Sequence, residues 1–171
     1  YRLGIRKLSR ELEDLAFPYV FPDGYQELQT LLKEGDNERK ENLEKFRKSV
    51  SKELVKNGMV EFTSDYRVKG MYSLYKKFLK AKKDMDNIYD ILAMRVTVKK
   101  PEDCYRTLGI IHAAWKPLPG RIKDYIAFPK PNGYQSLHTT IFTGDGSIIE
   151  VQLRTEEMDR DAAFGVAAHF A

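Results

Sequence analysis

The sequence contains little that could cross-link or anchor the chain. Its 171 residues include one cysteine, Cys104, which excludes an internal disulfide and leaves a thiolate metal site without partners. None of the three histidines is followed by aspartate or spaced like a zinc ligand. No apolar run approaches the roughly 20 residues that a membrane span needs, and no signal peptide follows Tyr1. We therefore expect a cytoplasmic chain with no membrane partner, cut from a longer protein.

Charge is divided unevenly along the chain. With 42% apolar and 32% charged residues, the composition is that of a folded domain. Residues 61–142 carry 15 basic against 8 acidic residues, whereas residues 143–171 carry 2 against 6. This division suits a site that holds phosphates beside a carboxylate-bound metal, and it equally suits a plain RNA-binding face. Composition leaves both open.

Hydrophobic periodicity and turn residues predict a mixture of helices and strands. Residues 3–16 show helical spacing, which Pro18 and Pro22 should end. The other expected helices are 36–54, stopped by Gly58, then 71–83 and 101–115. Residues 59–62 and 89–98 are expected strands, and 116–132 a loop with at most a short strand.

The last third of the chain has the clearest pattern. Residues 136–143 and 147–153 are joined by Gly-Asp-Gly, which predicts a hairpin. If Thr143 pairs with Ser147, the apolar residues share one face, and the other face carries four polar residues: His138, Thr140, Glu150 and Gln152. Thr155 should cap a final helix. We expect helices to bury the apolar face and the polar face to line a cleft.

Three groups of residues could carry chemistry. Asp90 and Glu150 are carboxylates on separate strands that could hold Mg²⁺, although carboxylates on strands more often face water. The second group is Arg67, Lys69, Ser73 and Lys77. The first two lead into the expected helix, and the last two share its face near the start, where free N–H groups could bind a phosphate chain. A solvated basic surface is the simpler interpretation of this second group.

The third group lies in the loop at residues 121–136. Lys123, Lys130 and Asn132 could contact phosphates and base edges, while Tyr134 could stack on a base. A structural loop with a buried tyrosine would explain the prolines and the glycine there, but it would leave the lysines and Asn132 without a role.

Six motifs in residues 67–169 make the sequence similar to the synthetase domain of RelA/SpoT-type proteins, which make the alarmones ppGpp and pppGpp. The motifs are RVKGMYS, IYDILAMRV, CYRTLGIIHAAW, GRIKDYIAFPKPNGYQSLHTT, EVQLRT and GVAAH. Residues 1–28 resemble the segment that joins the hydrolase to the synthetase domain in long members. The resemblance thus implies a helical linker over residues 1–35 and a synthetase domain over residues 36–171.

The resemblance implies an α+β, nucleotidyltransferase-like fold with a mixed sheet of about five strands flanked by helices. It implies transfer of pyrophosphate from ATP to the ribose 3′-hydroxyl of GTP or GDP, with Mg²⁺ as cofactor. The hydrolase and regulatory domains would lie outside this chain, as would any contact with the ribosome. A catalytically restrained guanine-nucleotide sensor or an RNA-binding domain is the alternative.

The resemblance also assigns roles to particular residues. It implies that Asp90 holds Mg²⁺ and that Glu150 either shares the metal or takes the proton from the 3′-hydroxyl. The residues expected to bind ATP are Arg67, Lys69, Ser73, Lys77 and Arg95. Those expected to bind the guanine nucleotide are Lys123, Lys130, Asn132, Tyr134, His138 and Gln152.

Overall fold

The computed structural model describes residues 6–33, 36–68, 70–81, 92–144 and 147–165. The helices are α1 (Arg6–Val20), α2 (Pro22–Lys33), α3 (Asp36–Lys56), α4 (Met71–Lys80), α5 (Pro101–Ala114) and α6 (Glu156–Phe164). The strands are β1 (Phe62–Val68), β2 (Leu92–Val98), β3 (Lys123–Asp124), β4 (Leu137–Phe142) and β5 (Ile148–Thr155). In the part of the chain that the structure describes, no helix is long and apolar enough to cross a membrane.

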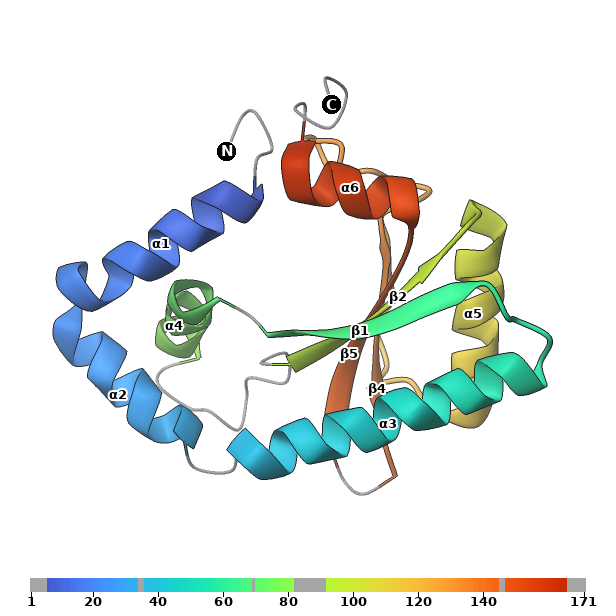
Figure 1. The fold of residues 1–171 in the computed structure, drawn as a ribbon, viewed down its shortest axis with the longest axis horizontal. Helices are drawn as coiled ribbons and strands as arrows, with labels where there is room; N and C mark the ends of the chain where they lie inside the picture. The colour runs from blue at the N-terminus through green and yellow to red at the C-terminus, as the bar shows by residue number, and fades with distance from the viewer. Residues whose placement is uncertain (1–5, 34–35, 69, 82–91, 145–146, 166–171) are drawn as a thin grey trace.

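The strands form one mixed sheet in the order β1-β2-β5-β4-β3. β2 and β5 run parallel, and every other neighbouring pair is antiparallel. Helices flank the sheet, so the predicted α+β class is confirmed (Figure 1).

The hairpin register is confirmed residue by residue. Leu137 pairs with Leu153, His138 with Gln152, and Thr140 with Glu150. Thr155 caps α6 as expected, because its hydroxyl accepts a hydrogen bond from the backbone N–H of Met158 at 3.2 Å.

The predicted strand at residues 59–62 is wrong. Gly58 has a positive φ of 77° and ends α3, and the Met59 N–H still donates to the Leu54 carbonyl of that helix. Met59 is buried as a core side chain, and ladder pairing starts only at Phe62. Burial after the helix end therefore accounts for Met59 alone, since Val60 is 73% exposed.

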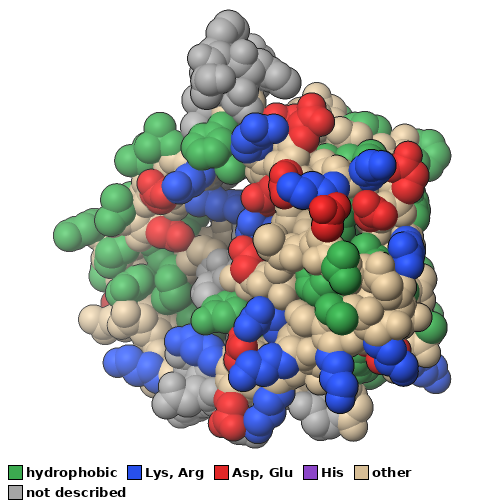
Figure 2. All heavy atoms as spheres, turned by 45° about the vertical axis from the view of Figure 1, so that its right-hand side comes forward, with side chains coloured by type: hydrophobic (Ala, Val, Ile, Leu, Met, Phe, Trp, Pro, Cys, Tyr) green, Lys and Arg blue, Asp and Glu red, His purple; other side chains and the backbone are tan. Residues whose placement is uncertain are grey.

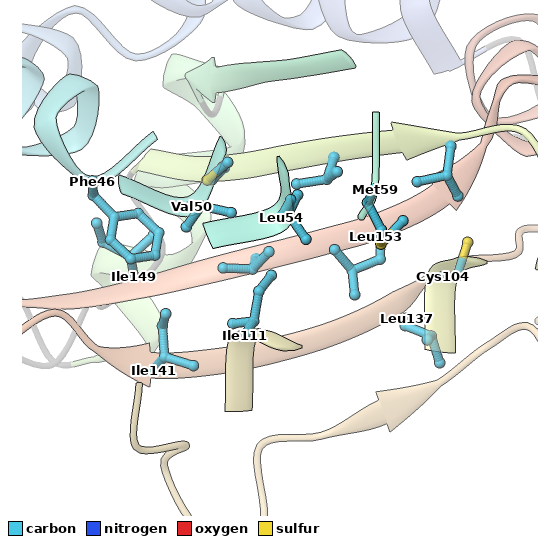
Figure 3. Close-up of a cluster of buried hydrophobic side chains, with 14 of the residues drawn as sticks. Phe46, Val50, Leu54, Met59, Cys104, Ile111, Leu137, Ile141, Ile149 and Leu153 are labelled. Atoms are coloured by element: carbon cyan, nitrogen blue, oxygen red, sulfur yellow. The ribbon is translucent and has the colours of Figure 1, made fainter. Parts of the chain in front are cut away.

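One face of the sheet is buried under α3 and α5. α3 supplies Leu43, Phe46, Val50 and Leu54 to a cluster that also holds the apolar side chains of β2, β4 and β5 (Figure 3). Cys104 of α5 is buried in the same cluster, and burial above all raises the pKa of its thiol to about 12. It therefore behaves as a small apolar core residue.

A second, smaller cluster joins α1 and α2 to α4. Pro18 was expected to end the first helix, but α1 continues to Val20 with Pro18 inside it. Phe17 explains the difference, because its side chain is 1% exposed and holds this part of α1 against α4. Tertiary packing thus outweighs the backbone hydrogen bond that proline cannot make.

The apolar residues whose spacing predicted the first helix point away from that cluster. Leu8, Leu12 and Leu15 are all exposed. In Figure 2, hydrophobic side chains gather on the left, where α1 and α2 lie, and basic and acidic side chains intermix over the rest of the visible face.

Alanine substitutions at two neighbouring positions of α3 should lower the free energy of unfolding by different amounts. Leu54 is 0% exposed and Val55 is 54% exposed. We expect Leu54→Ala to lower the free energy of unfolding by about 2–5 kcal/mol, because it leaves a cavity between helix and sheet. Val55→Ala should change it by about 0.5 kcal/mol or less. Urea denaturation measures both, and equal losses would contradict this packing.

Candidate active site

Four predicted site residues lie in one row across the sheet. Register pairs Arg95 of β2 with Gln152 of β5, Gln152 with His138 of β4, and His138 with Lys123 of β3. In the neighbouring row, Arg67 of β1 pairs with Ala93, Ala93 with Glu150, and Glu150 with Thr140. Since residues in register share a face, five predicted site residues from four strands lie on the face opposite the core: Arg95, Lys123, His138, Glu150 and Gln152.

Hydrogen bonds connect the centre of this face. The Tyr134 hydroxyl lies 2.8 Å from His138 Nε2, and His138 Nδ1 lies 3.2 Å from Glu150 Oε1. Gln152 donates through Nε2 to the same carboxylate oxygen at 2.6 Å. Two neighbours therefore fix one oxygen of the half-buried Glu150 carboxylate.

Next to this centre, two arginines share one carboxylate. Arg95 donates through Nη1 to Asp159 Oδ1 at 2.9 Å, and Arg154 Nε lies 3.2 Å from the same oxygen. Arg154 is only 3% exposed, and it also donates to Gln152 Oε1 at 3.2 Å. Burial is the main reason that the pKa of Arg154 is lowered; Tyr134 and Asp159 act against this and Arg95 adds to it.

The loop residues predicted to bind guanine nucleotide come together around a group of rings. Lys130 Nζ lies 4.3 Å from the Tyr125 ring centroid and 5.1 Å from that of Tyr134. Tyr134 is 8% exposed and packs edge-on against His138. Asn132 is exposed, and its Oδ1 accepts from the Tyr134 N–H at 3.4 Å. Tyr134 is therefore a buried ring with a cation over it.

The predicted ATP residues of the helix lie on α4. Ser73 and Lys77 stand one turn apart and are both half-buried. α4 begins three residues after Val68, the last residue of β1, so the helix starts close to the row that contains Arg67.

A pocket of about 340 Å³ lies between α1, the sheet and α6. Its lining includes two cations of α1, Lys7 and Arg10, and three of the residues described above, Arg95, Tyr134 and Arg154. Asp159 and Gly70 also border it. The pocket thus joins the expected ATP side to the ring of the expected guanine side. Cations from three elements line it together with the carboxylates of Glu11, Asp14 and Asp159.

Three predicted residues cannot be placed in this geometry. Asp90 and Lys69 lie outside the described residues, and only the backbone of Arg67 is described. Within the described ranges, no group of three or more histidine, cysteine, aspartate or glutamate side chains could hold a metal ion. Glu150 therefore stands as the one carboxylate of the predicted metal pair whose surroundings are defined.

The sequence reasoning missed Arg154, Asp159, Tyr125 and Arg10. Arg154 could have been found, because it follows Gln152 by two residues and so shares its face. Asp159 and Arg10 carry no local signal, since their place at the pocket depends on how α6 and α1 pack on the sheet.

Comparison with known proteins identifies the family. The family model described as "Region found in RelA / SpoT proteins" matches residues 66–171. The chain belongs to the RelA/SpoT family. It is 47% identical over 170 residues to a guanosine-3′,5′-bis(diphosphate) 3′-pyrophosphohydrolase of Borreliella burgdorferi, covering 99% of this chain and 25% of that protein.

Other RelA/SpoT relatives are named for synthesis, or for both synthesis and hydrolysis. The bifunctional (p)ppGpp synthase/hydrolase SpoT of Escherichia coli is 43% identical over 171 residues, covering 100% of this chain and 24% of that protein. A GTP pyrophosphokinase of Myxococcus xanthus is 44% identical over 169 residues, covering 99% of this chain and 22% of that protein. The chain spans about a quarter of the length of these curated relatives.

Solved structures share the fold. The small alarmone synthetase 2 of Bacillus subtilis superposes with a TM-score of 0.58 at 24% identity, covering 88% of this chain and 80% of that one. A GTP pyrophosphokinase family protein of Streptococcus pneumoniae gives a TM-score of 0.54 at 23% identity, covering 94% and 77%. The five-stranded sheet with flanking helices is therefore the fold of alarmone synthetases.

The shared carboxylate predicts a stability effect that does not depend on any ligand. Asp159→Asn leaves the buried Arg154 beside Arg95 without the charge that both contact. We expect a loss of about 2 kcal/mol in the free energy of unfolding, between the values for exposed and buried pairs, since Asp159 is partly exposed. Glu157→Gln, on the exposed surface of the same helix, is the control. Denaturant melts that coincide for both variants would contradict the arrangement.

Proposed function

We propose that this chain transfers the pyrophosphate of ATP to the ribose 3′-hydroxyl of GTP or GDP, giving pppGpp or ppGpp and AMP. The observation that carries the proposal is the pair of neighbouring rows across the sheet. They bring Arg95, expected at ATP, and Glu150, expected at the reacting hydroxyl, onto one face with His138, Gln152 and Lys123.

Glu150 is the proposed acceptor of the hydroxyl proton. Gln152 and His138 both contact its Oε1, which holds the carboxylate in one orientation on the polar face. Tyr134 in turn contacts the far nitrogen of His138. A general base must be positioned within hydrogen-bond reach of its proton, and this chain of contacts supplies that positioning.

Cations of the same face would bind the phosphates and adenine of ATP. The Nε groups of Arg95 and Arg154 are buried and make no hydrogen bond within the described residues, although Arg154 Nε lies 3.2 Å from Asp159 Oδ1 and Arg95 Nε lies 3.7 Å from Asp65 Oδ1. Since these ion pairs lack hydrogen-bond geometry, an anion in the adjoining pocket could complete the bonding of the two donors. We place Ser73, Lys77, Arg67 and Lys69 on this ATP side with Arg95.

The guanine nucleotide would bind at the loop and β3, through Lys123, Lys130, Asn132 and Tyr134. In the present arrangement Lys130 lies over the Tyr134 ring. Because Tyr134 is only 8% exposed and Lys130 lies over its ring, a base that stacks there must displace the lysine.

Mg²⁺ would be held by Asp90, and also by Glu150 if that carboxylate shares the metal instead of taking the proton. When bound, the ion would neutralise charge on the transferred phosphates. The residues of this chain would hold the two nucleotides in line for that transfer.

We expect Glu150→Gln to remove most turnover. Protein is mixed with ATP, Mg²⁺ and either GTP or GDP, and AMP and the new guanosine polyphosphate are separated by anion exchange. We expect a loss of about 100-fold or more, since general acid–base groups contribute about 10²–10⁴-fold, with nucleotide binding retained. Glu61→Gln, an exposed change of the same chemistry, should leave the rate unchanged.

The same assay, together with binding measurements for the nucleotides and for RNA, separates the proposal from its alternatives. Equal rates for Glu150→Gln and wild type would contradict the role of Glu150. Two nucleotides bound without product would favour the restrained sensor, and RNA bound in preference to nucleotides would favour the RNA-binding domain. Incubation with ppGpp tests whether this chain has the hydrolase activity for which several relatives are named. Release of pyrophosphate would show that the chain is not limited to synthesis.

Stacking at Tyr134 predicts a contrast between two substitutions. Tyr134→Leu removes the ring and should raise the KM for GTP or GDP about fivefold or more, because stacking contributes about 1–3 kcal/mol per base. Tyr134→Phe keeps the ring and loses the hydroxyl contact with His138, so the acceptor KM should change little. Steady-state kinetics with ATP saturating measures both. An unchanged KM in a folded Tyr134→Leu protein would rule out stacking.

A further inference from the structure

The N-terminus of α4 is capped by a residue of α1. The helix begins after Gly70, which has no side chain with which to bond the free N–H groups of the first turn. Asp14 Oδ1 instead accepts a hydrogen bond from the Tyr72 N–H at 2.9 Å. A carboxylate 58 positions away in sequence thus performs the task of a local N-cap, and its negative charge suits the helix dipole.

Gly70 supplies the room for this contact. Its φ of −55° and ψ of 140° are open to any residue, so backbone conformation does not require glycine here. A Cβ at this position would instead lie 2.5 Å from Asp14 Oδ2, closer than side-chain carbons approach other atoms. The glycine in the motif RVKGMYS is therefore explained by the approach of Asp14.

Aromatic packing holds α1 in place for the cap. The Phe17 ring lies one turn beyond Asp14, with its centroid 4.9 Å from that of Tyr75 and 5.5 Å from that of Tyr72. In α2, a Cβ at Gly24 would lie 2.4 Å from the Tyr75 ring, so that glycine is also a point of close approach. Figure 1 shows α1 and α2 wrapped around α4 on the side away from α3 and α5.

We infer that Asp14 is a positioning residue for ATP: it fixes the first turn of α4 and, through it, Ser73 and Lys77. The inference rests on the proposed function, which places those two residues at ATP. Ser73 directly follows Tyr72, whose N–H is held by Asp14, and Lys77 lies one turn further on. The first turn of a helix frays most readily when its N–H groups lack partners, so the cap limits motion where Ser73 stands.

The opposite effect would follow if the carboxylate competed with a phosphate for the same N–H groups. Two negative groups at one helix end repel each other, and removal of Asp14 would then tighten ATP binding. The two possibilities differ in the sign of the change in ATP affinity, which makes the question decidable.

The first experiment compares Asp14→Ala, Asp14→Asn and Glu13→Gln. For Asp14→Ala we expect the KM for ATP to rise about fivefold, which is the typical stability contribution of an N-cap expressed as an equilibrium factor, with the KM for GTP unchanged. Asp14→Asn should stay near wild type, because an amide oxygen caps nearly as well as a carboxylate. Glu13→Gln loses the same charge from the same helix, where Glu13 pairs with the exposed Lys76, and it should also resemble wild type.

A second variant tests the cap by replacing it locally. Serine at position 70 would supply its own N-cap, but only where the space occupied by Asp14 has been vacated. We therefore expect the single variant Gly70→Ser to raise the KM for ATP. The double variant Gly70→Ser with Asp14→Ala should return the KM for ATP to the wild-type value. Additive losses in the combined variant would overturn the inference, as would a lower ATP KM in Asp14→Ala or equal rises for ATP and GTP.

Two further measurements distinguish failure of this inference from failure of the proposed function. Binding of a non-hydrolysable ATP analogue is measured by calorimetry, and hydrogen exchange is measured at the Tyr72 amide. A wild-type protein that binds no ATP overturns the proposed function and the role of Asp14 with it. A wild-type protein that binds ATP, with Asp14→Ala equal in affinity and in exchange, overturns the role of Asp14 alone.

Discussion

The rest of the structure depends on the register in which β2, β5 and β4 pair, because that register puts the apolar side chains of all three strands on one face. Side chains alternate across a strand, so a slip of one residue would move every apolar side chain of that strand to the polar face. The observed register places Val151 beside Met94 and Thr139, under the helices, and Gln152 beside Arg95 and His138 on the other side. Burial of the core thus fixes the register, and the register assembles the site.

The polar face concentrates cations that the fold must stabilise before any ligand binds. Arg154 and Arg95 are held by the single carboxylate of Asp159, and Arg95 Nε also lies 3.7 Å from Asp65. These ion pairs leave the two buried Nε groups without hydrogen bonds, and an anion in the adjoining pocket could supply the missing acceptor. α1 contributes at the same border, since it adds cations to the pocket and caps α4 through Asp14.

Local patterns were sufficient wherever neighbours in sequence are also neighbours in space. The β4–β5 register, the Thr155 cap and the start of α5 at Pro101 follow from turn chemistry, alternation and capping. The course of α1 through Pro18 and the start of β1 at Phe62 did not follow, because packing of Phe17 and burial of Met59 decide them. Nor could Asp14 be assigned, since it acts on a segment 58 positions away, and the contact of Asp159 with Arg95 likewise spans 64 positions.

In the proposed reaction both nucleotides meet on the polar face of the sheet, with Glu150 at the reacting hydroxyl. A crystal structure with GDP, Mg²⁺ and a non-hydrolysable ATP analogue would show whether they do. We expect a Glu150 carboxylate oxygen about 2.6–3.2 Å from the ribose 3′-hydroxyl, with the ATP phosphates reaching the pocket beside Arg95. A guanine nucleotide bound elsewhere, with its ribose away from Glu150, would contradict this expectation.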